Sequence, residues 1–373
     1  MSKIVVDLDA YVIDSSHKVF KCSPGKTYRF YREVRRTKTV FLDIRGLDAL
    51  PQDTSLWKDD DILKLIADDR WARELESREK GNEPVGSEGV GRADKTRLGF
   101  LKGLLFEAKK GDLIVVPVDG YNKDVLIGEV LDDAGDVRRI EATDDEDTFV
   151  YLGRRVEWRA ATPKRFLEDD LITAIHTQTA FFLLGRNLYE GIYRLAFGNF
   201  IFDGNFVSEF KTSKERFTAE DHAVVSTWIN GLDVLYNSPE FHASSAIKNL
   251  PSFFELGLKQ LDDDISAEVK IDIQSPGEIF VKTAGPFALA LMAMFALSAC
   301  DSKAIVDNGV TVNLKTVGSA DGGGAAVSDC VNAMVIALGQ SRLDQECSLG
   351  KRASEDAKLT TPATLKSGKK GSN

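Results

Sequence analysis

The residues that could do chemistry gather first between residues 26 and 38, where basic and aromatic side chains alternate. The aromatic ones are Tyr28, Phe30 and Tyr31, and the basic ones are Lys26, Arg29, Arg32, Arg35, Arg36 and Lys38. Arginines neutralise phosphates and aromatic faces stack on bases, so this composition indicates a nucleic-acid contact. The alternative is a solvent-exposed strand face whose tyrosines pack inward. Because the chain carries a formal net charge of −10, any such contact must use a local patch.

A second chemical pattern is Glu268-Val269-Lys270, which has the ExK spacing of metal-dependent nucleases. That chemistry needs a further acidic ligand from an earlier strand, with the lysine near the attacking water. The nearest acidic run, Asp262 to Asp264, is too close in sequence to come from a separate strand. A nuclease that uses Glu268 and Lys270 with Mg²⁺ therefore stays as the alternative, and no other catalytic residue, metal or cofactor is expected.

Composition limits the class of protein. A length of 373 residues allows two or three domains, and a hydrophobic content of 43% with 28% charged residues is ordinary for a folded globular chain. The four cysteines, Cys22, Cys300, Cys330 and Cys347, form no CxxC pair, which argues against structural zinc and a disulfide framework. The N-terminal residues show no apolar core of a signal peptide, so we expect a cytoplasmic protein.

The elements that must position these residues follow from the hydrophobic pattern. A Gly111-Asp112 turn opens the aliphatic run Leu113 to Pro117, which is typical of a buried strand. The other elements expected before residue 163 are strands at 39–44, 125–130 and 151–158, an amphipathic helix at 58–80 and a short apolar helix at 98–108. Short strands separated by turns predict a small β-barrel with flanking helices.

The ordered motifs resemble a known family. A helix followed by GDLIVVP (111–117), IGEV (127–130) and RRVEW (154–158) is similar to the N-terminal PUA/EVE-like domain of Mrr-like restriction proteins, over about residues 28–165. The resemblance implies a pocket that reads nucleic acid, often a modified base in DNA, within prokaryotic defence against phage. Arg45 stands where the family strand often has an aromatic residue.

The same resemblance supplies candidate site residues. Tyr121, Tyr151 and Trp158 are the expected aromatic walls, and Arg154 and Arg155 are the expected phosphate contacts. Neighbouring residues on a strand point to opposite faces, so these two arginines cannot line one pocket. The full set of candidate nucleic-acid contacts is Arg29, Arg32, Arg35, Arg36, Arg45, Tyr121, Tyr151, Arg154, Arg155 and Trp158.

The second half of the chain is predicted to be helical at first and then α/β. Thr162-Pro163 predicts the start of a helix at 164–184, Asp203-Gly204 a hairpin, and Thr218 to Asp221 a capping box. The uncharged stretch 284–300 is short for a membrane span, which needs about 20 residues, and predicts a buried helix. Strand 310–314 is expected beside 279–281, followed by an apolar helix at 328–338.

These patterns predict an α+β protein divided into residues 1–162, 163–262 and 263–347, with a disordered tail at 348–373. The leading hypothesis is a non-enzymatic protein that recognises nucleic acid, with DNA as the expected partner. Its C-terminal regions would mediate signalling or assembly, as a homo-oligomer or with a partner defence protein. The alternatives are the Mg²⁺-dependent nuclease and a membrane-associated effector that inserts 284–300, although a membrane partner is not expected.

Overall fold

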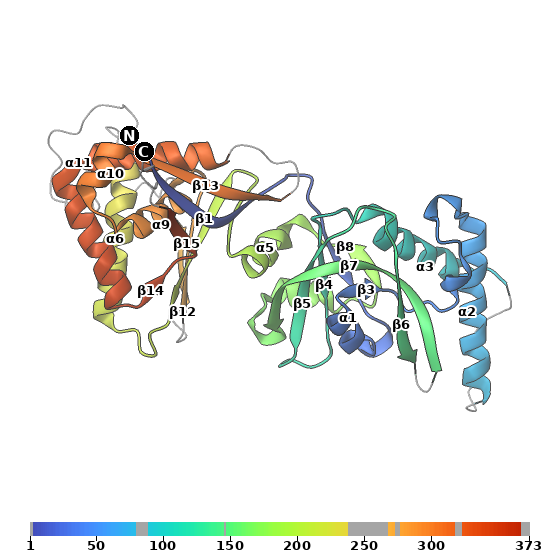
Figure 1. The fold of residues 1–373 in the computed structure, drawn as a ribbon. Coiled ribbons are helices and arrows are strands. Elements are labelled where there is room, and N and C mark those ends of the chain that lie inside the picture. The colour runs from blue at the N-terminus through green and yellow to red at the C-terminus, as the bar shows by residue number, and fades with distance from the viewer. Residues whose placement is uncertain are drawn as a thin grey trace. The chain divides into compact units, whose positions relative to one another are not determined.

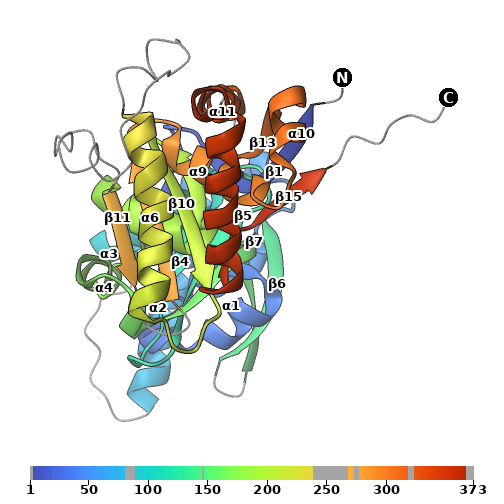
Figure 2. The same ribbon diagram turned by 90° about the vertical axis from the view of Figure 1, so that its left-hand side faces the viewer.

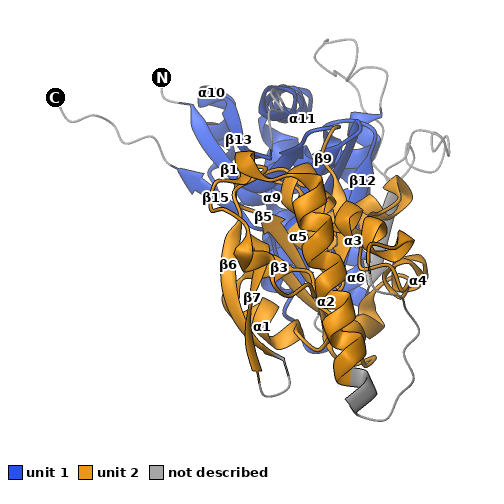
Figure 3. Cartoon of the chain, turned by 90° about the vertical axis from the view of Figure 1, so that its right-hand side faces the viewer, with its two compact units in different colours: residues 1–15, 197–373 blue, residues 16–196 orange. Residues whose placement is uncertain are grey.

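The computed structural model describes residues 3–79, 89–144, 147–237, 268–272, 277–317 and 323–366. The chain forms two compact units, each a mixture of helices and β-sheet: unit 1 comprises residues 1–15 and 197–373, and unit 2 comprises residues 16–196 (Figures 1 and 3). The α+β prediction is confirmed. The expected divisions after residues 162 and 262 differ from this partition, because residues 1–15 join the second half of the chain and 163–196 stay with unit 2.

Unit 2 is built on a mixed sheet with the strand order β3-β7-β5-β4-β2-β8, with β6 added to β7, and it curls into a half-barrel. The curl follows from β7, whose first half pairs with β6 and β3 and whose second half pairs with β5. The elements are β2 (Val19–Cys22), η1 (Lys26–Tyr28), α1 (Tyr31–Thr37), β3 (Thr39–Phe41), η2 (Leu47–Ala49), η3 (Thr54–Leu56), α2 (Asp59–Glu79), α3 (Arg92–Lys102), η4 (Gly103–Glu107), β4 (Leu113–Val116), β5 (Asp124–Val130), β6 (Arg138–Asp144), β7 (Asp147–Pro163), η5 (Lys164–Phe166), α4 (Asp169–Ile175), β8 (Phe181–Leu183), η6 (Arg186–Leu188) and α5 (Tyr189–Phe197).

The Gly111-Asp112 turn, which is prominent in the sequence, connects β4 to the segment before β2 through hydrogen bonds. Gly111 has φ 93°, a conformation that favours glycine. Its carbonyl accepts a hydrogen bond from Nε2 of the buried His17 (2.8 Å), and the Asp112 carboxylate accepts from the backbone amides of Lys18 (2.9 Å) and Lys109 (2.8 Å). These bonds tie β4 to the residues before β2, so the turn sets the register of the sheet. Burial raises the pKa of Asp112.

The helix expected at 164–184 is wrong. The chain instead forms η5, the short α4 and the strand β8, which pairs antiparallel with β2. The physical reason lies in Lys21, a fully buried residue of β2 whose Nζ donates to the carbonyls of Thr177 (2.9 Å) and Thr179. Those two carbonyls therefore face an ammonium group from the sheet, and the helix stops before them.

Unit 1 surrounds β1 (Ile4–Ile13), which pairs with β13 (Val310–Val317) on one side and with β9 (Asn199–Phe202) and β15 (Ala363–Lys366) on the other. Helices α6, α9 and α11 pack on this sheet (Figures 1 and 2). The remaining elements are β10 (Asn205–Thr212), α6 (Ala219–Tyr236), β11 (Glu268–Asp272), β12 (Gly277–Thr283), α9 (Phe287–Leu297), α10 (Ser302–Asn308), α11 (Gly323–Glu355) and β14 (Leu359–Thr360).

Helix α9 is buried inside unit 1, which confirms the predicted buried apolar helix. Every residue except Ala296 is buried, against a core that includes Phe210 and Trp228. Across the described ranges, no helix has both the length and the apolar character that crossing a bilayer requires. The hairpin β9–β10 and the capping box of Thr218 and Asp221 are also confirmed.

Two other expectations for unit 1 are wrong. Strand β13 pairs in parallel with β1 and not with β12, because β12 lies between β10 and β11. The expected tail from residue 348 is ordered as far as Lys366: it completes α11 and supplies β14 and β15, which add to β10 and β1. A polar sequence is sufficient here because strands β14 and β15 gain their hydrogen bonds from an existing sheet.

Strand β13 lies at the end of the sheet, and α11 protects that edge. The Asn332 amide accepts from the Val310 amide and donates to the Val310 carbonyl, both at 2.8 Å, as a neighbouring strand would. Ser328 Oγ accepts from the Val312 amide at 2.8 Å. An unpaired edge is a template for another strand, so these side chains act against self-association.

Removing this protection should expose the edge. We expect the double variant Ser328→Ala/Asn332→Ala to lose about 1.5–4.5 kcal/mol of unfolding free energy, since three hydrogen bonds are lost and each contributes about 0.5–1.5 kcal/mol. Its mass measured by light scattering should rise with concentration while the wild type stays constant. Ser348→Ala, on an exposed position of α11, is the control. Wild-type stability and mass in the double variant would contradict this role.

Candidate nucleic-acid interface

The basic stretch forms a helix, and its arginines face solvent. In α1 only Val34 is buried, while Arg32, Arg35 and Arg36 are exposed. Arg35 has a long ion pair with Asp124 (3.5 Å). Within the described part of the chain Arg32 and Arg36 have no ion-pair partner. The alternative of a solvated strand face is wrong because the segment is helical, and its spacing puts all three arginines on one face.

The loop that leads into α1 is strained. Thr27 has φ 53° and Tyr28 φ 59°, so two successive side chains adopt the left-handed conformation, which is rare for a β-branched residue. Such residues cost about 1–3 kcal/mol each and cluster at functional sites. The loop is closed by bonds from the Tyr28 amide to the Gly25 carbonyl (3.1 Å) and from the Phe30 amide to the Pro24 carbonyl (3.1 Å). Burial, and then the negative charge of Asp119, raise the pKa of Tyr28.

Helix α1 is joined to the first residue of β5 and to β7. The Tyr31 hydroxyl donates to the carbonyl of Asp124 at 2.5 Å, and the Trp158 indole donates to the carbonyl of Arg35 at 3.2 Å. The Trp158 ring lies over Gly128, where an added Cβ would be 2.8 Å from the ring. The structure thus brings Trp158 and Arg35 together as neighbours, with Trp158 partly buried.

Beside α1 lies a second exposed group, which we call the aromatic shelf: Tyr121, Arg165 and Phe166. The side chains of Tyr121 and Phe166 are 62% and 56% exposed. The Arg165 guanidinium lies over the Phe166 ring at 4.7 Å and donates to Asn122 Oδ1 at 3.1 Å. The sequence identified Tyr121 but missed Arg165 and Phe166, because it assigned them to the interior of a long helix.

Hydrogen bonds fix the backbone of the aromatic shelf. The Arg165 amide donates to the Tyr121 carbonyl (3.1 Å), and the Lys164 amide donates to the Lys123 carbonyl (3.1 Å). The buried Lys164 ammonium donates to the Val118 carbonyl (2.5 Å), and its desolvation lowers the pKa of Lys164. In addition, Asp124 pairs with Pro163 in the sheet. Tyr121, Phe166 and α1 therefore belong to one connected surface of unit 2.

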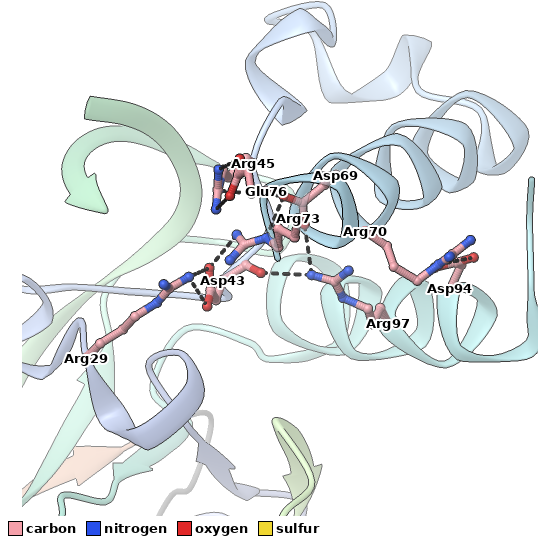
Figure 4. A network of polar contacts seen from close by, with 9 residues as sticks. All are labelled: Arg29, Asp43, Arg45, Asp69, Arg70, Arg73, Glu76, Asp94 and Arg97. Atoms are coloured by element: carbon pink, nitrogen blue, oxygen red, sulfur yellow. Dashed lines mark hydrogen bonds and ion pairs between the residues drawn. The ribbon is translucent and has the colours of Figure 1, made fainter. Parts of the chain in front are cut away.

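Two other candidate arginines serve a structural network (Figure 4). Arg29 binds Asp43 (2.7 Å), and Arg45 binds Glu76 (2.7 Å) and lies over the Phe149 ring at 4.5 Å. The network also contains the buried Asp69 and Asp94 with Arg70, Arg73 and Arg97. It ties α2 and α3 to the segment after β3, so the charges of Arg29 and Arg45 are matched by carboxylates.

Tyr151 and Arg154 are placed in the core, which corrects their expected roles. Tyr151 is fully buried, with its ring 5.0 Å from those of Phe30 and Phe41. Arg154 is also fully buried and donates to the carbonyls of Leu105 and Ala108, both at 2.9 Å, and of Asp132. Neither side chain can reach a base or a phosphate outside this fold.

Arg155 points the other way from Arg154, as strand geometry predicts. It binds the carboxylate of Asp132 at 2.5 Å and borders an open polar cavity of about 440 Å³ that also contains Asp53, Asp136 and Arg138. The carboxylates lining this cavity repel phosphate, so Arg155 is a weaker candidate for a nucleic-acid contact than the α1 arginines.

The nuclease pattern lies on β11, where Glu268 pairs with Lys282 and Lys270 with Phe280 of β12. The side chains of Glu268 and Lys270, and the whole of Asp262 to Asp264, lie outside what the structure describes. In the segments it does describe, no three acidic, histidine or cysteine side chains are grouped to hold a metal ion.

Comparison of the chain with protein-family models, with curated proteins and with solved structures finds no match in any of the three.

Proposed function

We propose that unit 2 is a nucleic-acid recognition module whose partner is DNA and whose phosphate contacts are the α1 arginines. The observation that carries the proposal is the pair of exposed arginines, Arg32 and Arg36, which have no ion-pair partner among the described residues. In a chain of net charge −10, many arginines of this unit are matched by carboxylates, as Figure 4 shows for five of them. Cations left unmatched on one helical face are a site for an anionic partner.

Two further observations support a binding role for this part of unit 2. The strained Thr27-Tyr28 loop lies directly before the arginines, at a place where strain has no packing role for Thr27, which is exposed. The second is the resemblance of the motifs GDLIVVP (111–117), IGEV (127–130) and RRVEW (154–158) to the PUA/EVE-like domain of Mrr-like restriction proteins. On this proposal the protein works in prokaryotic defence, with unit 1 serving assembly or signalling.

The proposal predicts a specific salt dependence. Each phosphate contact contributes about 0.9 to the slope of log K against log salt, so Arg32→Ala/Arg36→Ala should lower the slope by roughly two and weaken DNA binding at low salt. The measurement is fluorescence anisotropy with a labelled oligonucleotide at several salt concentrations. Arg92→Ala, an exposed arginine of α3, is the matched control and should bind as the wild type does.

Both exposed positions tolerate alanine without loss of packing, so the thermal stability of the double variant should be unchanged. If no oligonucleotide binds the wild type at low salt, the proposed function is wrong. If DNA binds but the double variant keeps the wild-type slope, the phosphate contacts lie elsewhere.

A further inference from the structure

The aromatic shelf indicates the kind of ligand more narrowly than the phosphate contacts do. Tyr121 and Phe166 are large apolar rings that expose more than half of their surface, although aromatic side chains usually contribute to stability through burial. The backbone at both positions is restrained by neighbouring residues. The backbone of Arg165 is bonded to that of Tyr121, and its side chain is held between Asn122 and the Phe166 ring. The backbone that carries the rings is thus fixed, and the Phe166 ring is in contact with Arg165, which reduces the entropy lost when a ligand stacks on them.

The kind of ligand follows from what can reach such rings. In a duplex the faces of the bases are covered by their neighbours, and only edges and phosphates are accessible. In a single strand the faces are free, and aromatic side chains together with arginines form the usual platform for them. The Arg165 guanidinium, which lies over the Phe166 ring, adds a planar cation that can itself stack on a base.

The shelf is also connected to α1 through Asp124. Asp124 lies three residues after Tyr121. Its backbone carbonyl accepts a hydrogen bond from the Tyr31 hydroxyl of α1, and its carboxylate forms the ion pair with Arg35 of α1. Its strand partner is Pro163, which directly precedes η5. The sheet therefore fixes the distance between the arginine row and the two rings.

We infer that unit 2 binds unpaired, single-stranded DNA in preference to duplex, with Tyr121 and Phe166 as stacking residues and the α1 arginines as phosphate contacts. This inference rests on the proposed function and deepens it. It names stacked bases, not a groove, as the feature that is bound, and it assigns to Arg165 and Phe166 roles that the sequence did not suggest.

The test compares oligothymidine with a mixed-sequence duplex of equal length, both labelled, with the full chain. The single strand should bind more tightly. Phe166→Leu and Tyr121→Leu, which keep apolar bulk but remove the ring, should each weaken single-strand binding by about fivefold or more and leave duplex binding unchanged. Phe166→Tyr and Tyr121→Phe retain a ring and should bind as the wild type does. Leu56→Ala, at a residue that is 61% exposed on another element, controls for loss of apolar surface.

The outcomes separate the inference from the proposed function. Duplex binding equal to or tighter than single-strand binding, with no effect of either leucine variant, overturns the inference and leaves the proposed function standing. Failure of both oligonucleotides to bind at low salt overturns the two together. Loss of single-strand affinity in the leucine variants but not in the ring-retaining variants supports stacking.

Discussion

Replacing Arg154 by methionine is expected to lower the unfolding free energy of unit 2 by about 3–5 kcal/mol, because it removes several hydrogen bonds from a charged donor and each such bond contributes about 1.5–3 kcal/mol. The guanidinium joins three parts of the unit: the carbonyls of Leu105 and Ala108 at the end of η4, the carbonyl of Asp132 after β5, and β7 itself. Methionine fills part of the volume but donates no hydrogen bond, so the Ala108 carbonyl would lose its donor and the Leu105 carbonyl would keep only the Gly135 amide (2.9 Å).

The measurement is urea unfolding followed by tryptophan fluorescence, which reports mainly on unit 2 because Trp57, Trp71 and Trp158 lie in it and only Trp228 lies in unit 1. The matched control is Arg155→Met, one residue along the same strand but directed outward, where we expect a loss of less than about 1 kcal/mol. Arg154→Lys should be intermediate, since an ammonium group cannot span carbonyls on separate elements. Equal stabilities for Arg154→Met and the wild type would contradict the structural role.

Replacing Glu346 by glutamine is expected to stabilise unit 1 at pH 8 and to have little effect at pH 4.5. Glu346 lies on α11, is 5% exposed, and its Oε2 has no hydrogen-bond partner in the described structure. Burial raises the pKa of this carboxyl to about 7. At a pH between the ordinary pKa of a glutamate and about 7, the folded protein keeps a proton that the unfolded chain has lost. The unfolding free energy therefore falls as the pH rises through that interval.

A shift of this size corresponds to at most about 3 kcal/mol, which glutamine should restore above pH 7 because it is neutral at every pH. The measurement is the unfolding free energy of both proteins at pH 4.5, 6 and 8, followed by circular dichroism. Glu355→Gln, at the exposed end of the same helix, is the control and should run parallel to the wild type. If Glu346→Gln loses stability between pH 4.5 and 8 as steeply as the wild type does, burial of this carboxyl is not what limits stability.

Much of the fold could be predicted from local patterns, because several elements are set by their own residues. The aliphatic run after Gly111-Asp112 forms β4, the Asp203-Gly204 turn joins β9 to β10, and the uncharged stretch around Met292 forms a buried helix. The failures share one cause, which is stabilisation by distant segments. The helix expected after Pro163 gives way to β8 because Lys21 and β2 pair with it, and β14 and β15 need partner strands that precede them by well over a hundred residues.

The candidate site was predictable to the same degree. The basic and aromatic composition of residues 26–38 indicated the patch, but it did not predict that Arg32, Arg35 and Arg36 share one face of a helix. Strand periodicity separated Arg154 from Arg155 but could not say which of them faces the core. Burial of Arg154 depends on carbonyls about 50 residues earlier, and the neutralisation of Arg29 and Arg45 depends on carboxylates supplied partly by α2. No local signal carries that information.

The position of β1 has a consequence for synthesis on the ribosome. This central strand is synthesised before its neighbours β9, β13 and β15, which all follow after residue 198, with β15 ending at Lys366. Unit 2, by contrast, is continuous from residue 16 to residue 196 and can complete its sheet as soon as it leaves the exit tunnel. The nascent chain therefore holds an apolar strand without a partner while the DNA-binding candidate is already folded, and residues 1–15 wait for the rest of their own unit.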